Sequence, residues 1–146
     1  AALIGLAFGP IVDKIGALKA FKFALLINTA LFAILYFITD FLTHPKIAVT
    51  VLMISQLANT LIFISSIALF MSLCRISIST TQFACYMAVL NLGKSFGAYA
   101  YPKVFSFTGL EGIFWAISAI LGISWIILYL FNPETHKVHL AKLEKA

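Results

Sequence analysis

The side chain with the clearest capacity for chemistry is Lys94, which lies near the middle of an apolar run over 80–104. A charged side chain at the centre of a bilayer costs about 2.5 to 3.5 kcal/mol on insertion scales, so it is expected to face a water-filled cavity or a charged partner. The four long apolar runs of the sequence contain no Asp or Glu. The counter-ion must therefore come from a missing part of the protein, from a substrate anion or from the cavity. We favour a substrate or coupling role over a structural ion pair with an absent helix.

Polar side chains on two of the apolar runs could line a cavity together with Lys94. A helical wheel places one group on the arc of Lys94 and the arc beside it, and a second group on one face of the run over 48–73. Hydrogen bonds between helices, worth about 1 kcal/mol each, are the commoner use of such groups. Gly93 and Gly97, four residues apart, predict a close contact with another helix. The candidates for a solute pathway are Lys94, Asn91, Gln82 and Tyr86 from the later run, and Gln56 and Asn59 from the earlier one.

The sequence contains none of the familiar catalytic arrangements. There is no paired nucleophile and base, no glycine-rich phosphate loop after a strand, and no pair of carboxylates. His136 and His139 lie three residues apart, but no third metal ligand is near them. We therefore predict no enzymatic activity, no bound metal and no cofactor.

The composition explains why an ammonium group at Lys94 is unusual. Of the 146 residues, 62% are apolar and only 10% are charged, whereas a soluble domain has roughly 45 to 50% apolar and about 25% charged residues. Such a chain has too little polar surface for a soluble enzyme domain, and it is too apolar for a disordered tail. The net charge of +5 does not indicate nucleic-acid binding, because the basic residues lie at the edges of apolar runs, as in membrane proteins.

Four apolar runs are long enough to cross a bilayer, since about 20 helical residues span a hydrocarbon core of about 30 Å. The sequence predicts an all-α polytopic membrane helix bundle with spans over 18–39, 48–73, 80–104 and 113–131. Turn or charge signals end the runs, among them His44-Pro45, Pro102-Lys103 and Asn132-Pro133. Residues 1–8 are too few to span, so they are expected to be the end of a helix whose beginning is missing.

The basic residues also predict the orientation. Counted over alternating sides, seven lie on one side and two on the other, and Lys94 lies within a span. Cytoplasmic loops carry the excess of Lys and Arg, so we expect segment 9–17 and the tail over 132–146 to be cytoplasmic. The residues on the cytoplasmic side are Lys14, Lys19, Lys22, Arg75, Lys137, Lys142 and Lys145, and those on the other side are Lys46 and Lys103.

The segment 9–17 is expected to be a cytoplasmic loop, and it carries a specific pattern. Gly9, Asp13, Lys14 and Gly16 resemble the signature loop of the major facilitator superfamily, in which glycine, aspartate, a basic residue and a second glycine have these spacings. In that superfamily the loop occurs between helices two and three and again between eight and nine. Four spans and a tail follow it here, so the resemblance implies the second copy, with the spans as helices nine to twelve. Arg75 is the expected partner of the Asp13 carboxylate.

A second stretch resembles one branch of that superfamily. Thr81-Gln82-Phe83-Ala84 followed by Leu92-Gly93-Lys94 is similar to helix eleven of the peptide, acetyl-CoA and drug transporters, which include the bacterial muropeptide permeases. Lysine replaces the more usual arginine at position 94.

The resemblance implies a secondary active transporter that moves a bulky anionic, muropeptide-like solute across a bacterial inner membrane. Alternating access driven by a proton gradient is the implied mechanism, and the implied partners are the missing N-terminal half, the solute and the lipid bilayer, with no nucleic acid. One alternative stays open at this point. The chain could be a noncatalytic four-helix membrane subunit that packs against a partner chain, in which Lys94 would pair with that partner.

Overall fold

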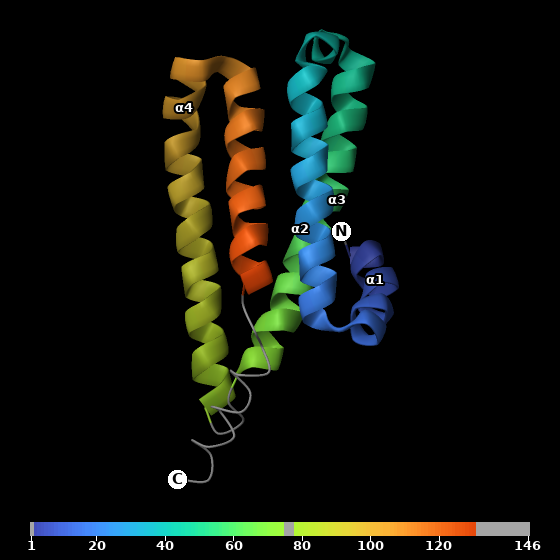
Figure 1. Cartoon of the computed structure of the whole chain (residues 1–146), viewed down its shortest axis with the longest axis vertical. Coiled ribbons are helices and arrows are strands. Elements are labelled where there is room, and N and C mark those ends of the chain that lie inside the picture. The colour runs from blue at the N-terminus through green and yellow to red at the C-terminus, as the bar shows by residue number, and fades with distance from the viewer. Residues whose placement is uncertain (1, 75–77, 131–146) are drawn as a thin grey trace.

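The computed structural model describes residues 2–74 and 78–130, with side chains from Phe8 onward, and these residues form a bundle of helices (Figure 1). The elements are α1 (Ala2–Ile15), α2 (Ala17–Phe37), the short 3-10 helix η1 (Thr39–Thr43), α3 (Pro45–Leu73) and α4 (Ser79–Leu130). No strand occurs in this part of the chain. The all-α prediction is therefore confirmed.

Helix α2 lies between α3 and the second half of α4, and small residues permit the close packing. Ala20, Ala24 and Asn28 follow one another at intervals of four and are all buried, so they form one face of α2. The Asn28 Nδ2 donates hydrogen bonds to the carbonyl oxygens of Ala24, at 2.9 Å, and of Ala58 on α3, at 3.0 Å. Asn28 thereby joins α2 to α3 at the centre of the bundle.

The adjoining side of α2 contacts the second half of α4. The Ser118 Oγ donates to the carbonyl oxygen of Thr29 at 3.2 Å. The rings of Phe32 and Phe114 lie with their centroids 6.2 Å apart. These contacts fix the second half of α4 against α2.

The element α4 consists of two helical segments, 79–108 and 110–130, joined at Gly109, where the chain turns back on itself (Figure 1). Gly109 has φ 67° and ψ −168°, a backbone conformation that is essentially restricted to glycine. The first segment continues through Pro102 to Thr108, so Pro102 does not end the helix as the sequence suggested. Proline is tolerated inside membrane helices because neighbouring groups satisfy the freed backbone carbonyl.

Substitution of Gly109 by alanine is expected to destabilise the protein, because a residue with a Cβ is strained at this φ and ψ. Strain of this kind costs on the order of 1 to 3 kcal/mol, which will lower the midpoint of thermal unfolding of detergent-purified protein. Gly122→Ala is the matched control, since Gly122 is helical and its added Cβ would meet only Thr29 Cγ2, at an ordinary 3.7 Å. An equal loss of stability in both variants would contradict the proposed role of Gly109.

The segment 9–17 differs from the expected loop. Residues 9–15 belong to α1, and only Gly16 lies between α1 and α2. Gly16 has φ 91°, and its N–H donates to the carbonyl oxygen of Val12 at 2.8 Å, which closes the end of α1 in the manner of a glycine C-cap. Gly9 is helical, so only Gly16 provides the turn that the glycines were expected to give.

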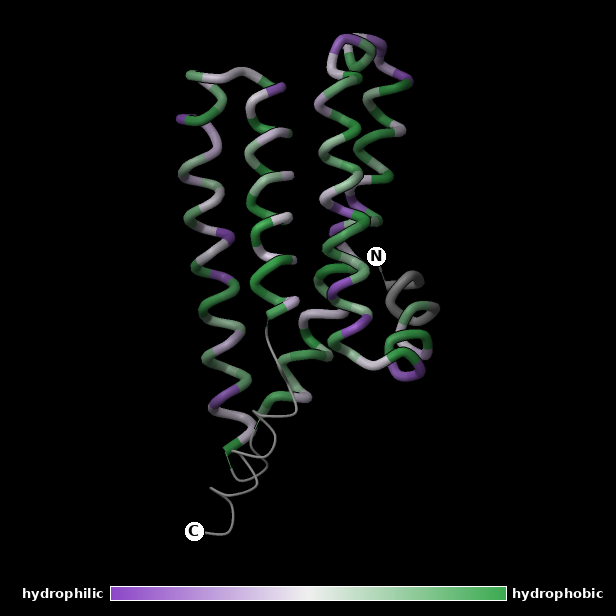
Figure 2. Tube along the Cα trace, viewed as in Figure 1, coloured by the Kyte–Doolittle hydropathy of each residue, from purple (hydrophilic) through white to green (hydrophobic). Residues whose placement is uncertain are grey.

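The helices α2, α3 and α4 are each long and apolar enough to cross a membrane. Figure 2 shows hydrophobic residues along them and hydrophilic residues at the turn that joins α2 to α3. Large apolar side chains remain exposed on the outside of the bundle, including Phe37 at 80% and Phe107 at 88%. Water is a poor solvent for such a surface, so the fold is that of an integral membrane helix bundle.

Candidate functional site

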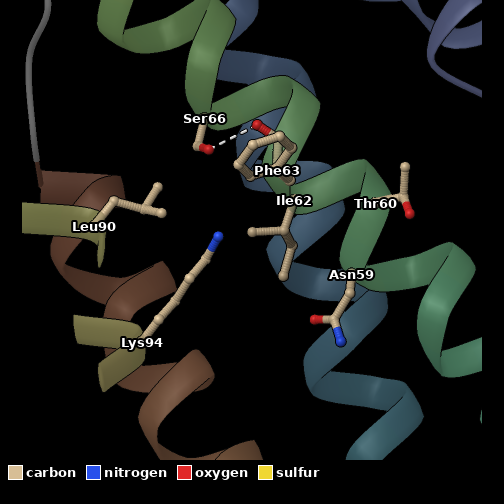
Figure 3. A pocket seen from close by; sticks show the side chains of 7 residues that line it. All are labelled: Asn59, Thr60, Ile62, Phe63, Ser66, Leu90 and Lys94. Carbon is tan, nitrogen blue, oxygen red and sulfur yellow. Dashed lines mark hydrogen bonds between the residues drawn. The ribbon is translucent and has the colours of Figure 1, made fainter. Parts of the chain in front are cut away.

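A groove of about 550 Å³ lies between α3 and the first segment of α4. Figure 3 shows the Lys94 side chain extending from α4 across this groove toward Ile62, Phe63 and Ser66 of α3. The lining residues are Asn59, Thr60, Ile62, Phe63, Ser66, Leu90 and Lys94. We refer to these seven residues as the Lys94 groove. Its volume falls in the range of sites that hold small molecules, about 300 to 1,000 Å³.

Helical periodicity brings the α3 residues of the Lys94 groove to one face. Asn59, Phe63 and Ser66 are separated by four and three residues, so their side chains lie above one another along α3. The α4 segment runs in the opposite direction. Accordingly Phe63 meets Lys94, whereas Phe70, seven residues later on α3, meets Tyr86, eight residues earlier on α4.

The Lys94 ammonium lies over the ring of Phe63, with Nζ 4.8 Å from the ring centroid. A cation over an aromatic face is stabilised by about 0.5 to 2 kcal/mol, which is less than an ammonium group gains from a carboxylate in a dry site. The acidic residues of the described chain, Asp13, Asp40 and Glu111, are near the ends of their helical segments rather than in the middle. The ring of Phe63 therefore holds the ammonium in place without neutralising it.

The remaining polar groups of the Lys94 groove differ in their freedom to bind a ligand. The Ser66 hydroxyl donates to the carbonyl oxygen of Phe63 at 2.8 Å, and the Thr60 hydroxyl donates to that of Gln56 at 2.8 Å. Thr60 also points away from Lys94 (Figure 3). The Asn59 side chain is exposed, and its amide can both donate and accept hydrogen bonds. The groove thus presents one cation, one amide and an aromatic face.

The groove continues toward the Tyr86 end of the helix pair. A second hollow of about 500 Å³ shares Ile62, Ser66 and Leu90 with the Lys94 groove. Its other lining residues are Phe21, Phe70, Tyr86 and Val89, and we call these four residues the aromatic end. The rings of Phe70 and Tyr86 are stacked there, with centroids 5.2 Å apart and planes inclined by 29°. A polar hollow and an apolar hollow therefore adjoin, with Ile62, Ser66 and Leu90 between them.

The structure brings some of the predicted pathway residues together and separates others. Lys94 and Asn59 line one groove, and Tyr86 lines its extension. Gln56 lies instead in a separate apolar hollow with Val49, Leu52, Met53 and Leu57. Asn91 is exposed and Gln82 is half-buried, and neither is among the residues that line the two joined hollows.

Gly93 and Gly97 were predicted to contact another helix closely, and no described residue makes such a contact. No atom of this part of the chain lies within 4 Å of the position that a Cβ would take at either glycine. Residues 91–99 are all exposed. This face of α4 is open beside the Lys94 groove.

The signature residues lie at the α1 to α2 turn. Asp13 and Lys14 are exposed in the last turn of α1, and Gly16 follows them. The expected partner of Asp13, Arg75, lies outside the described residues, as does the predicted tail over 132–146. The pairing of Asp13 with Arg75 therefore stays a prediction.

Sequence reasoning missed Phe63, Ser66 and Phe70. The signal was present, because these residues continue the spacing that begins at Asn59 at intervals of three or four. A phenylalanine among 14 in a membrane protein does not stand out by type alone. Its position opposite a lysine on another helix follows only from the packing of α3 against α4.

These features define a class of protein: an integral membrane helix bundle with an ammonium group and polar side chains in a groove between helices. The chain belongs to the Major Facilitator Superfamily, whose model matches residues 1–146. Members of this family are secondary transporters rather than enzymes. No curated protein and no solved structure matches the chain. The family predicted from the loop over 9–17 is thus confirmed.

Proposed function

We propose that this chain is the C-terminal part of a secondary active transporter that moves a bulky anionic solute across a bacterial inner membrane. In this proposal α2, α3 and the two segments of α4 are helices nine to twelve, and the cytoplasmic side carries the turn at Gly16 and the tail. An N-terminal half of the same protein would complete a binding cavity near the bilayer midplane, which opens to each side in turn.

The observation that carries the proposal is the position of the Lys94 Nζ in an open groove, where its neighbour is the Phe63 ring. An ammonium group in a membrane bundle requires compensation, and the ring supplies only part of it. A carboxylate or phosphate of a solute would supply the rest through charge-assisted hydrogen bonds. The exposed Asn59 amide could bind a hydroxyl or amide of the same solute.

The resemblance of the stretch from Thr81 to Lys94 to the muropeptide permeases supports a sugar-peptide of the cell wall as the solute. Such a molecule carries carboxylates for the ammonium group and hydroxyls for the amide. A proton gradient is the proposed source of energy. The proton-carrying group would lie in the N-terminal half.

Replacement of Lys94 by glutamine in the full-length transporter is the test. A hydrogen bond to a charged group contributes about 1.5 to 3 kcal/mol, so the KM for uptake of a labelled anionic sugar-peptide into proteoliposomes is expected to rise roughly tenfold to a hundredfold. Lys103→Gln is the control, because Lys103 lies on the same helical segment, outside the groove, where its Nζ donates to the Tyr99 hydroxyl at 2.7 Å.

Unchanged uptake by the Lys94→Gln protein would overturn the assignment of Lys94 to the solute pathway. The alternative of a noncatalytic subunit makes a different prediction. In that case the wild-type protein shows no uptake on its own, and Lys94→Gln weakens its association with a partner chain.

A further inference from the structure

The Lys94 groove and the aromatic end are neighbouring hollows with two chemically different linings. Ile62, Ser66 and Leu90 belong to both hollows. Beyond these shared residues, one region offers the ammonium of Lys94 and the amide of Asn59. The other offers Phe21, Phe70 and Val89 together with the ring of Tyr86. A ligand that extends from one hollow into the other must therefore match both linings.

We propose that the site binds an amphiphilic anion, with its acidic group at Lys94 and an apolar or aromatic group against Phe70, Tyr86 and Val89. This inference rests on the proposed transport of a bulky anionic solute, and it requires of that solute an apolar group besides the carboxylates and hydroxyls named above. Charge complementarity selects an anion at one end, and the stacked rings select an apolar group at the other. A fully hydrophilic anion would fill only the Lys94 groove.

The spacing of the residues sets the length of such a ligand. Lys94 and Tyr86 are eight residues apart on one helical segment, which corresponds to about 12 Å along the helix axis at about 1.5 Å per residue. The antiparallel α3 offers the matching pair of Phe63 and Phe70. In a ligand that spans both hollows, the acidic group and the far edge of the apolar group should therefore be about 12 Å apart, which is the rise of eight helical residues.

The stacked pair is a suitable wall for an apolar group because it already joins the two helices. The Tyr86 ring lies beside Phe70, and Val89, one turn along α4, is 67% exposed. An apolar ligand group placed there would cover exposed Val89 and half-buried aromatic surface without displacing a buried side chain. The gain in affinity would come from removing this surface from water or lipid headgroups.

Binding of phenylalkanesulfonates with one to six methylenes to the purified full-length protein tests the proposal, with methanesulfonate as the anion that lacks the apolar group. Each methylene buried contributes about fourfold in affinity. The dissociation constant in wild-type protein is therefore expected to fall about fourfold per methylene until the ring reaches Phe70 and Tyr86, and then to level off. Isothermal titration calorimetry in detergent measures this series.

The variant Val89→Asn places an amide in the aromatic end at an exposed position, so it leaves the buried packing intact. The preference is the dissociation constant of methanesulfonate divided by that of the longest phenylalkanesulfonate. We expect this ratio to be at least tenfold smaller in Val89→Asn than in the wild type. Leu92→Asn is the matched control, because Leu92 is 70% exposed on the same segment and lines neither hollow. The ratio for Leu92→Asn should equal that of the wild type. Because partition of the ligands into detergent is the same for all three proteins, this control also corrects for it.

A flat series in wild-type protein would overturn the inference, and would mean that another helix of the protein covers the aromatic end. Retention of the full preference in Val89→Asn would overturn it as well. Failure of the underlying transport proposal looks different. In that case the wild-type full-length protein takes up no labelled sugar-peptide in proteoliposomes, whatever the chain-length series shows.

Discussion

Reversal of the charge at position 94, by Lys94→Glu, is expected to abolish uptake of the anionic solute. The new carboxylate would repel the acidic group of the solute at the place where the ammonium attracts it. It would also face the Phe63 ring, whose electron-rich face favours cations and disfavours anions. The effect should exceed that of glutamine at the same position, because attraction is replaced by repulsion rather than merely lost. Uptake into proteoliposomes, normalised to the amount of inserted protein, measures it.

The control for this experiment is Lys103→Glu, which makes the same change of net charge nine residues further along the segment. Lys103 contacts Tyr99, with Nζ 4.3 Å from the ring centroid, and does not line the Lys94 groove. Its reversal should leave the KM for the solute within about twofold of the wild type, since position 103 is about 13.5 Å from position 94 along the helix, at about 1.5 Å per residue. Equal losses in both variants would indicate a general effect of charge on insertion rather than a solute contact.

The second large effect is expected at the centre of the bundle, where Asn28→Asp should severely destabilise the fold. Asn28 is fully buried, and its Nδ2 donates to two carbonyl oxygens, those of Ala24 and Ala58. A carboxylate has no hydrogen to donate and would face both carbonyl oxygens with a negative charge. A buried charge at membrane depth costs about 2.5 to 3.5 kcal/mol on insertion scales, and two hydrogen bonds are lost besides.

Asn28→Ala separates the two contributions. It removes the same hydrogen bonds without adding a charge, so its cost should be about 1 to 2 kcal/mol, near the value of interhelical hydrogen bonds in membranes. Thermal unfolding of the purified protein should therefore rank wild type above Asn28→Ala and Asn28→Ala above Asn28→Asp. An aspartate variant as stable as the alanine variant would contradict the view that this position is sealed from water.

Much of the bundle could be predicted from the sequence because lipid imposes a simple length rule. Apolar runs of about 20 residues must be helices, and helical segments lie over each of the four predicted runs. His44-Pro45 was interpreted as an end signal of the first run, and the second run was predicted to begin at 48. In the structure Pro45 opens α3, where proline lacks only an N–H that has no helical partner. Pro102 was wrongly predicted to end a helix. A proline inside a membrane helix is tolerated, and the actual turn depends on Gly109, whose positive φ is invisible in the sequence.

The candidate site was only partly accessible to sequence reasoning. Lys94 stood out because its charge lies within an apolar run, and Asn59 stood out because its amide does so. The partners Phe63 and Phe70 are chemically ordinary, and their role depends on which face of α3 meets α4. Gln56 was a predicted pathway residue that the packing of the helices excludes from the groove. It is three residues from Asn59, yet it lines a different hollow. Periodicity gives the face of one helix, but it does not give the neighbour of that face.

The helices α2 and α3 differ in length although Asn28 joins them. With 21 residues, α2 is about 32 Å long, whereas α3, with 29 residues, is about 43 Å long. The first fits upright in a hydrocarbon layer of about 30 Å, and the second must tilt or extend among the lipid headgroups. Since α3 forms one wall of the Lys94 groove, we expect a thinner or thicker bilayer to act on the angle of that wall. Lipid chain length is therefore a physical variable that acts on the groove without any ligand.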